Sequence, residues 1–174
     1  MNRFFLIALA AASALAVQAQ TANPLSTEAK QSYTAIKNNL TRMAEKMPEE
    51  HYGFQPVPEI RTFGQLVAHV ADSQSRACSA AMGKQKQLGA ASKTSKADLV
   101  AALAESFADC DAAFDALTDA AAVEMITGPR GQRSKLGTLA GVTTHSNEEY
   151  GYMAVYMRLK NIVPPSSDRA AGKK

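Results

Sequence analysis

The chain has 174 residues and a mass of 18.5 kDa, which suits one compact domain and excludes a second full domain. Hydrophobic residues make up 46% of it and charged residues 20%, so the composition is that of a globular protein with a real core. Nineteen basic and sixteen acidic side chains give a net charge of +3, which is too small an excess for binding along a phosphate backbone. Nucleic acid is therefore not expected as a partner.

Residues 1–19 have the pattern of a secretory signal peptide. Arg3 supplies a positive charge, residues 4–17 are mostly apolar, and Val17-Gln18-Ala19 has the small residues of a cleavage site. An apolar run of about 14 residues is shorter than the roughly 20 that a membrane-spanning helix needs. The pattern predicts cleavage after Ala19, no membrane contact once the peptide is removed, and a periplasmic or secreted location.

The remainder of the chain carries helical patterns in four places and almost no strand pattern. The first predicted helix runs from Ser26 to about Pro48, and the second runs from Thr62 to about Gly83. The third runs from Ser95 to Leu117, and the fourth from about Lys135 to Lys160. Four helices of roughly 20 to 26 residues favour an all-α protein, a four-helix bundle about 30 Å long.

Local signals set the ends of these helices. The motif Thr62-Phe63-Gly64-Gln65 is a capping box, in which a hydroxyl and an amide satisfy free backbone N–H groups, and Ser95-Lys96-Ala97-Asp98 is a weaker version. Residues 84–94 are polar and are expected to form a loop. Residues 119–134 are expected to form a second loop, with a turn cluster of glycine and proline at 128–131.

Two of the three histidines lie on faces predicted to point into the bundle. His69 sits in the apolar run Leu66-Val67-Ala68-His69-Val70, where a buried imidazole needs a polar partner. His145 precedes Glu149 by four residues, so the two side chains share one helical face. Two imidazoles and one carboxylate suit Zn, Ni or Fe and leave coordination positions open. The alternative is two satisfied core histidines and a surface carboxylate, and the third histidine, His51, is expected to pack in a loop.

Several motifs of the chain are similar, in their order, to those of a known family. They are Phe54-Gln55-Pro56-Val57-Pro58-Glu59-Ile60-Arg61-Thr62-Phe63-Gly64, Leu66-Val67-Ala68-His69-Val70-Ala71-Asp72, His145-Ser146-Asn147-Glu148-Glu149-Tyr150-Gly151, Tyr156-Met157-Arg158 and Pro164-Pro165. Together they resemble the DinB-like (YfiT-like) metalloenzyme family. The resemblance implies one domain over residues 20–165, a four-helix bundle of up-down-down-up order. Residues 166–174 are polar and are expected to form a flexible tail.

The resemblance also implies a divalent metal held by one histidine of the second helix and a His-x3-His pair of the last. His69 matches the first ligand and His145 the second, whereas Glu149 stands where the family has its third histidine. Glutamate can ligate Zn or Fe, but its negative charge weakens the Lewis acidity of the metal. Two interpretations stay open, which are a working site of two histidines and a glutamate, and a degenerate site without metal.

The two cysteines test the helix order that the resemblance implies. If the second and third helices are parallel, Cys78 and Cys110 lie at the same height, since each follows the start of its helix by about 15 residues. In an oxidising compartment such a pair forms a disulfide. Two buried free thiols are the alternative.

Other residues could line a cavity near these ligands. Asp72 and Ser73 follow His69 closely and could orient its ring. A group of tyrosines and methionines on the last helix forms either core or a pocket wall, and three loop arginines could meet an anionic substrate. These residues are Tyr150, Tyr152, Tyr156, Met153, Met157, Arg61, Arg130 and Arg133.

These features favour an exported, metal-dependent enzyme, hydrolase-like or transferase, that acts on a small molecule. The family that the chain resembles includes thiol-dependent S-transferases. Low-molecular-weight thiols act mainly in the cytosol, so export argues against that chemistry. The alternative is a non-catalytic bundle that binds a small ligand or a metal at a degenerate site. A homodimer through an exposed helical face is neither required nor excluded.

Overall fold

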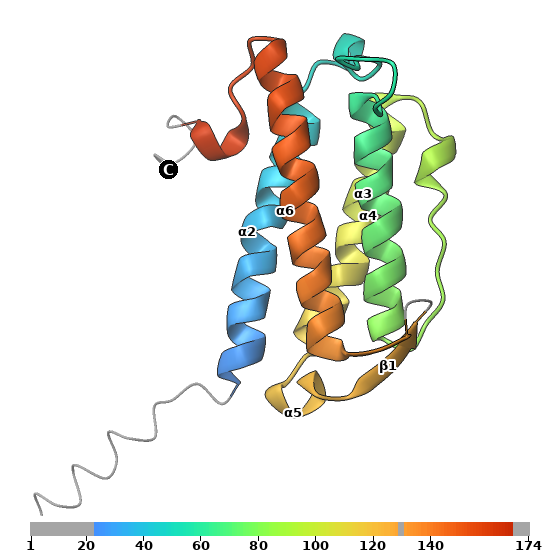
Figure 1. Ribbon diagram of the computed structural model, residues 1–174, viewed down its shortest axis with the longest axis vertical. Coiled ribbons are helices and arrows are strands. Elements are labelled where there is room, and N and C mark those ends of the chain that lie inside the picture. The colour runs from blue at the N-terminus through green and yellow to red at the C-terminus, as the bar shows by residue number, and fades with distance from the viewer. Residues whose placement is uncertain (1–22, 129–130, 169–174) are drawn as a thin grey trace, which may run out of the picture.

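The computed structural model describes residues 23–128 and 131–168, where four long helices form a bundle with a short helix and a hairpin at one end (Figure 1). The predicted signal peptide at 1–19 lies outside these residues. No helix within the described ranges is both long and apolar enough to cross a bilayer. The elements are α2 (Pro24–Lys46), α3 (Phe63–Ala81), α4 (Lys96–Asp115), α5 (Asp119–Ala122), β1 (Met125–Gly128), β2 (Gly131–Ser134) and α6 (Lys135–Leu159), with 3-10 turns at Glu49–His51, Ala90–Ser92 and Pro165–Ser167.

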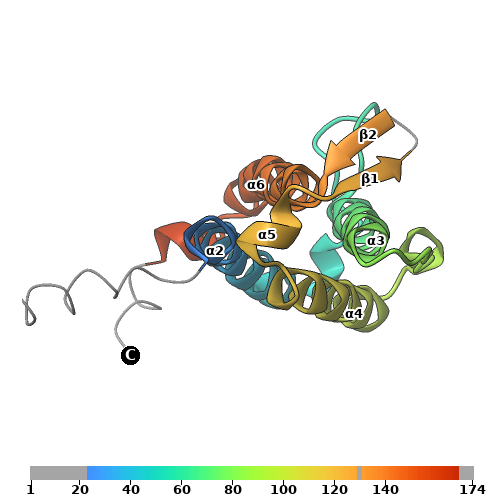
Figure 2. The same ribbon diagram turned by 90° about the horizontal axis from the view of Figure 1, so that it is seen from below.

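The four long helices form a ring in the order α2, α6, α3, α4 (Figure 2). Helices α2 and α6 run in one direction along the bundle, and α3 and α4 run in the other (Figure 1). The segment between α3 and α4 returns along the outside of the bundle, so these two consecutive helices are parallel. The all-α bundle and its up-down-down-up order are therefore confirmed.

A disulfide joins α3 to α4 through Cys78 and Cys110, whose Cα atoms are 4.9 Å apart. This confirms the predicted pairing, which needs parallel helices because only then do the two cysteines lie at one height. Beside it, the Ser75 hydroxyl donates to Asp109 at 2.6 Å, and Asp109 also accepts from Lys86 at 2.8 and 2.9 Å. Asp109 of α4 is therefore bonded both to α3 and to the segment that follows α3.

Side-chain caps begin the helices where the sequence predicts. The hydroxyl of Thr62 accepts from the backbone N–H of Gln65 at 3.1 Å, and the Gln65 side chain accepts from that of Thr62 at 2.9 Å, which completes the capping box of α3. The hydroxyl of Ser95 accepts from the backbone N–H of Asp98 at 3.1 Å. The Asp98 carboxylate accepts a hydrogen bond from the Ser95 hydroxyl at 2.7 Å and not from the Ser95 backbone N–H, so only half of the second box forms.

Helix α5 closes the lower end of the bundle and supplies the cap that α2 lacks. The Asn23 side chain makes no capping bond to its own helix. Instead, the carboxylate of Asp119 accepts from the backbone N–H groups of Leu25 at 3.2 Å and Ser26 at 2.8 Å. Asn23 in turn accepts from the backbone N–H of Asp119 at 2.9 Å, so the two segments cap each other.

The expectation of a loop over 119–134 is wrong, because this segment contains α5 and an antiparallel hairpin of β1 and β2. Each strand has four residues, most of them exposed, so neither carries the alternating apolar pattern that predicts a strand. Gly128 and Gly131, the first and last residues of the predicted turn cluster, pair with each other across the two strands, and residues 129–130 lie outside the described part of the chain. The hairpin lies across one end of α3 and α6 (Figure 2).

One continuous apolar cluster fills the bundle. The Tyr33 ring stacks on Phe114 with ring centroids 4.2 Å apart, and its hydroxyl donates to Asp111 at 2.9 Å. Burial and that hydrogen bond raise the pKa of Tyr33 well above its usual range. Burying one large apolar side chain contributes about 1.5–3 kcal/mol, so this cluster carries most of the stability. Its largest fully buried members also include Leu40, Met43, Met47, Phe63, Leu99, Leu139, Met153 and Met157.

Residues 166–168, which the sequence assigns to a flexible tail, are held against α6. The hydroxyl of Tyr150 donates to the Ser166 hydroxyl at 2.8 Å and accepts from the Ser166 backbone N–H at 2.9 Å. The guanidinium of Arg158 donates to the Ser167 hydroxyl at 3.0 Å. Polar residues are exposed here, yet hydrogen bonds to the last helix fix them.

Candidate metal centre

Helices α3 and α6 bring the three predicted ligands together. His69 lies on α3, and His145 and Glu149 lie on successive turns of α6. The Nε2 atoms of the two imidazoles are 3.1 Å apart, and Oε1 of Glu149 is 3.6 Å from that of His69 and 3.5 Å from that of His145. The three groups could hold a metal ion.

The triangle of donor atoms fits one face of a tetrahedral coordination sphere. With metal–nitrogen distances near 2.0–2.1 Å, neighbouring ligand atoms in such a sphere are about 3.4 Å apart. The observed separations of 3.1, 3.5 and 3.6 Å lie on both sides of that value. Three ligands on one face leave a fourth position open, as catalytic zinc sites do.

The site is deepest at Glu149. Its side chain is 7% exposed, whereas those of His69 and His145 are 30% and 32% exposed. Its Oε2 atom is buried and has no hydrogen-bond partner among the described residues. A buried carboxylate oxygen without a partner is costly, so a cation would compensate it. The two imidazole Nε2 atoms lie within hydrogen-bond distance of each other, at 3.1 Å, and the tautomers decide which ring donates.

Burial and neighbouring charges favour the protonation state of His69 that binds metal. Burial lowers the pKa of His69, and the charges of Arg61, His145 and Arg76 lower it further against the opposing charge of Asp72. A neutral imidazole is the form that ligates a metal. Burial raises the pKa of Glu149, although the charges of His145 and Arg61 oppose the shift. The ionised carboxylate is therefore under-compensated by the protein alone.

A cleft with a volume of about 620 Å³ opens beside the two histidines, between α3, α6 and the hairpin. Small side chains and glycines form much of its wall, and two arginines lie among them. The lining residues are His69, Ser73, Gln74, Arg76, Ala77, Ala80, Ile126, Thr127, Gly128, Gly131, Arg133, Thr138, Gly141, Val142 and His145. The hairpin that the sequence did not predict therefore completes the cleft.

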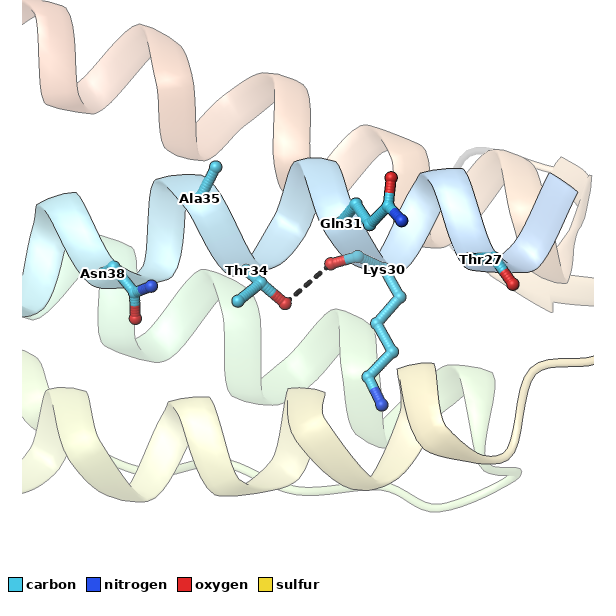
Figure 3. A pocket seen from close by; sticks show the side chains of 6 residues that line it. All are labelled: Thr27, Lys30, Gln31, Thr34, Ala35 and Asn38. Atoms are coloured by element: carbon cyan, nitrogen blue, oxygen red, sulfur yellow. Dashed lines mark hydrogen bonds between the residues drawn. The ribbon is translucent and has the colours of Figure 1, made fainter. Parts of the chain in front are cut away.

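A second hollow, of about 580 Å³, follows the outer side of α2 (Figure 3). All of its lining side chains come from this single helix, namely Thr27, Lys30, Gln31, Thr34, Ala35 and Asn38. The one charged group among them, Lys30, pairs with Asp115 of α4, and the Thr34 hydroxyl donates back to the Lys30 carbonyl at 2.8 Å. This hollow offers no histidine or carboxylate, so the α3–α6 cleft is the candidate site.

Asp72 does not orient a ligand imidazole. Its carboxylate accepts from the backbone N–H groups of Ala90 at 2.8 Å and Ala91 at 3.0 Å, so it fixes the 3-10 turn between α3 and α4. Ser73 lines the cleft, as the sequence suggested. His51 ends the 3-10 turn Glu49–His51 and is not part of the ligand group.

The aromatic and methionine residues of α6 do not line the cleft. Met153 and Met157 belong to the core, and Tyr152 is exposed. The hydroxyl of Tyr156 donates to the backbone carbonyl of Arg61 at 2.7 Å, which holds the segment before α3 against α6. Packing is therefore the role of Met153, Met157 and Tyr156, whereas Tyr152 belongs neither to the core nor to the pocket wall.

Three arginines line the cleft or act on the ligand group through their charge. Arg133 lines the cleft, and Arg61 acts on it through its charge. Arg130 lies outside the described residues. Arg76 and Gln74 also line the cleft, and sequence reasoning missed both. A signal for Arg76 exists, because a residue seven positions after His69 lies on the same helical face.

The profile of the DinB superfamily matches residues 32–153. A DinB-like protein from Bacillus cereus ATCC 10987 has a similar structure, with a TM-score of 0.69 and 18% identity over 79% of this chain and 93% of the other. A DinB-like protein from Bacillus subtilis gives a TM-score of 0.64 and 16% identity over 82% and 99% of the two chains. No curated protein matches the chain. The profile spans well over half of the chain and includes all three candidate ligands, so the chain belongs to the DinB superfamily.

Proposed function

We propose that the protein binds one divalent transition metal, Zn, Ni or Fe, through His69, His145 and Glu149. We propose further that the metal acts on a small molecule held in the α3–α6 cleft, in a hydrolase-like or transferase reaction. The observation that carries the proposal is the convergence of two Nε2 atoms and one carboxylate oxygen at 3.1 to 3.6 Å beside an open cleft.

Each ligand side chain has a separate part in such a site. A bound metal would supply Lewis acidity and lower the pKa of a group coordinated at the open position. Glu149 holds the only negative charge of the set in the buried wall, where little water competes for it. His69 and His145 line the cleft, so a molecule held there would lie beside a metal bound by the two imidazoles.

Metal binding can be tested by elemental analysis of protein purified without chelator or affinity metal. We expect one equivalent in the unaltered protein after reloading, and its loss in His69→Ala and Glu149→Gln. His51→Ala is the matched control, since it removes a histidine outside the ligand group and should retain the metal. Failure of the unaltered protein to take up Zn, Ni or Fe(II) would contradict the proposal.

A non-catalytic binding role is the second candidate, and the identity of the third ligand favours it. The carboxylate of Glu149 adds negative charge and so weakens the Lewis acidity of a bound cation. A metal-loaded protein that binds small molecules but turns over no ester, amide or activated electrophile would support this role over catalysis.

We also propose that the protein is exported to the periplasm or the medium. The pattern of residues 1–19 supports export, and so does the disulfide between Cys78 and Cys110, which is typical of oxidising compartments. Mass spectrometry of the natively expressed protein should find Gln20 at the amino terminus. Recovery of the uncleaved chain from the cytoplasm alone would contradict export.

A further inference from the structure

We propose that the hairpin end of the cleft is an anion subsite, in which Arg76, Arg133 and Gln74 bind the carboxylate of a small organic molecule. The other end of that molecule would reach the metal ligands. Only this second part rests on the proposed metal function, because the three side chains line the cleft whether or not a metal is bound.

The two guanidinium groups belong to the same end of the cleft. Arg76 follows His69 by seven residues, which places it about 10 Å further along α3 toward the hairpin. The Arg133 guanidinium donates to the Gly137 carbonyl at 3.1 Å, and its Nη1 would lie 3.5 Å from a Cβ at Gly141. Gly141 precedes His145 by one helical turn, so Arg133 also lies on the hairpin side of the ligands.

Neither arginine is neutralised by the protein. Both side chains are exposed, and no carboxylate of the described residues forms an ion pair with either of them. Other basic groups, such as Lys86, do have acidic partners. Unpaired guanidinium groups in a cleft suit a planar carboxylate, which accepts two parallel hydrogen bonds from one arginine.

Gln74 is the independent observation that points to a ligand. Gln74 is one of the residues that line the cleft and is 1% exposed, yet its side-chain Nε2 has no acceptor among the residues described. Its Oε1 lies 3.9 Å from the sulfur of Cys110, which is bonded to Cys78 and has no hydrogen to donate. A buried N–H group without an acceptor fits an oxygen atom that a ligand supplies.

The charge at the metal ligands favours the same class of molecule. A bound divalent cation would leave a positive site beside the one carboxylate, and Arg61 adds to the positive potential at His69 and Glu149. An anion is attracted to both ends of this cleft and a cation is repelled. The small side chains of Ala77 and Ala80 leave space for an apolar body between the ends.

The subsite can be tested by titrating the metal-free protein with hexanoate and, separately, with neutral hexanamide. Backbone amide chemical shifts measure the binding of each probe. Hexanoate should shift the Gly131 and Gly141 resonances and bind roughly tenfold more tightly than hexanamide. Arg76→Gln and Arg133→Gln should each weaken hexanoate binding roughly fivefold to tenfold without changing hexanamide binding. Arg42→Gln removes an exposed arginine of α2 outside the cleft and should change neither.

Equal affinities for the two probes, or an equal loss in Arg42→Gln, would overturn the subsite. Each substitution exchanges an exposed side chain, and the amide spectrum of each variant reports its folding directly. Arginine-dependent binding in a protein that takes up no metal would support the subsite and contradict the proposed metal function. Metal uptake without arginine-dependent binding would support the proposed metal function and contradict the subsite.

Discussion

Helix α3 has two sides with different chemistry. On the side facing α4, the polar and sulfur groups satisfy one another. Cys78 is bonded to Cys110, and the buried Ser75 hydroxyl donates to Asp109, which also accepts from Lys86. This interface needs nothing from outside the chain.

Around the cleft and on α6, buried groups lack partners. Oε2 of Glu149, Oγ of Ser146 and Nε2 of Gln74 are the three buried side-chain atoms without a hydrogen bond in the described part of the chain. Leaving one such group unsatisfied costs about 1–3 kcal/mol. Gln74 is a residue of the cleft lining, and Glu149 and Ser146 belong to α6, one of the helices that form its walls. The disulfide and the Asp109 contacts between α3 and α4 therefore serve stability, whereas the unsatisfied groups around the cleft and on α6 are available to a ligand.

The largest expected effect on stability is at the interface between α3 and α4. Replacing both cysteines, Cys78→Ala with Cys110→Ala, removes a link between residues 32 apart and should lower the free energy of unfolding by about 3–4 kcal/mol. Denaturant unfolding measures the loss. Metal uptake should be unchanged, and its loss in a folded double variant would show that the two sides of α3 are not independent.

The second prediction concerns the polar contacts of the same side. Asp109→Ala leaves the buried Ser75 hydroxyl without its acceptor and removes one of the two carboxylates that pair with Lys86, so the free energy of unfolding should fall by about 1–3 kcal/mol. Glu59→Ala, which removes an exposed carboxylate, is the control and should change it by less than about 0.5 kcal/mol. Equal changes in the free energy of unfolding for Asp109→Ala and Glu59→Ala would show that the Asp109 contacts do not stabilise the interface between α3 and α4.

The third prediction concerns Glu149 in the metal-ligand group, where removing a charged side chain should not lower the free energy of unfolding. The pKa of Glu149 is raised, so its ionised form is disfavoured in the fold at neutral pH. Glu149→Gln should leave the metal-free protein equally stable or stabilise it by up to about 1 kcal/mol. Added Zn should raise the Tm of the unaltered protein and not that of the variant. A marked destabilisation of the metal-free variant would mean that Glu149 is structural, as Asp109 is.

The smallest effect is a pH dependence. The pKa of His69 is lowered from 6.5, so its contribution to stability is present above pH 6.5 and is lost as the pH falls through the lowered value. The raised pKa of Glu149 acts in the opposite sense, since its contribution is present below pH 4.5 and is lost as the pH rises. In the Glu149→Gln background, His69→Asn should therefore flatten the decline of Tm between about pH 7 and about pH 5. An unchanged slope would contradict the assignment to His69.

Local signals in the sequence were sufficient for the four long helices. The capping box at Thr62 and the hydroxyl of Ser95 begin α3 and α4 at the predicted places, because a cap needs only residues three positions apart. The cap of α2 could not be found in this way, since Asp119 provides it from 93 residues away. The hairpin was missed for a related reason, because its exposed strands are held by pairing and not by a buried face.

The sequence by itself determined the helices, the ligand types at His69, His145 and Glu149, and, with the family resemblance, the parallel helices that join Cys78 to Cys110. Helical period places side chains four or seven positions apart on one face, so these features are encoded locally. Only the tertiary structure decided that the three ligand atoms meet within 3.6 Å and that a cleft opens beside them. Both depend on how α3, α6 and the hairpin pack together, and that packing is set by contacts between residues far apart in the chain.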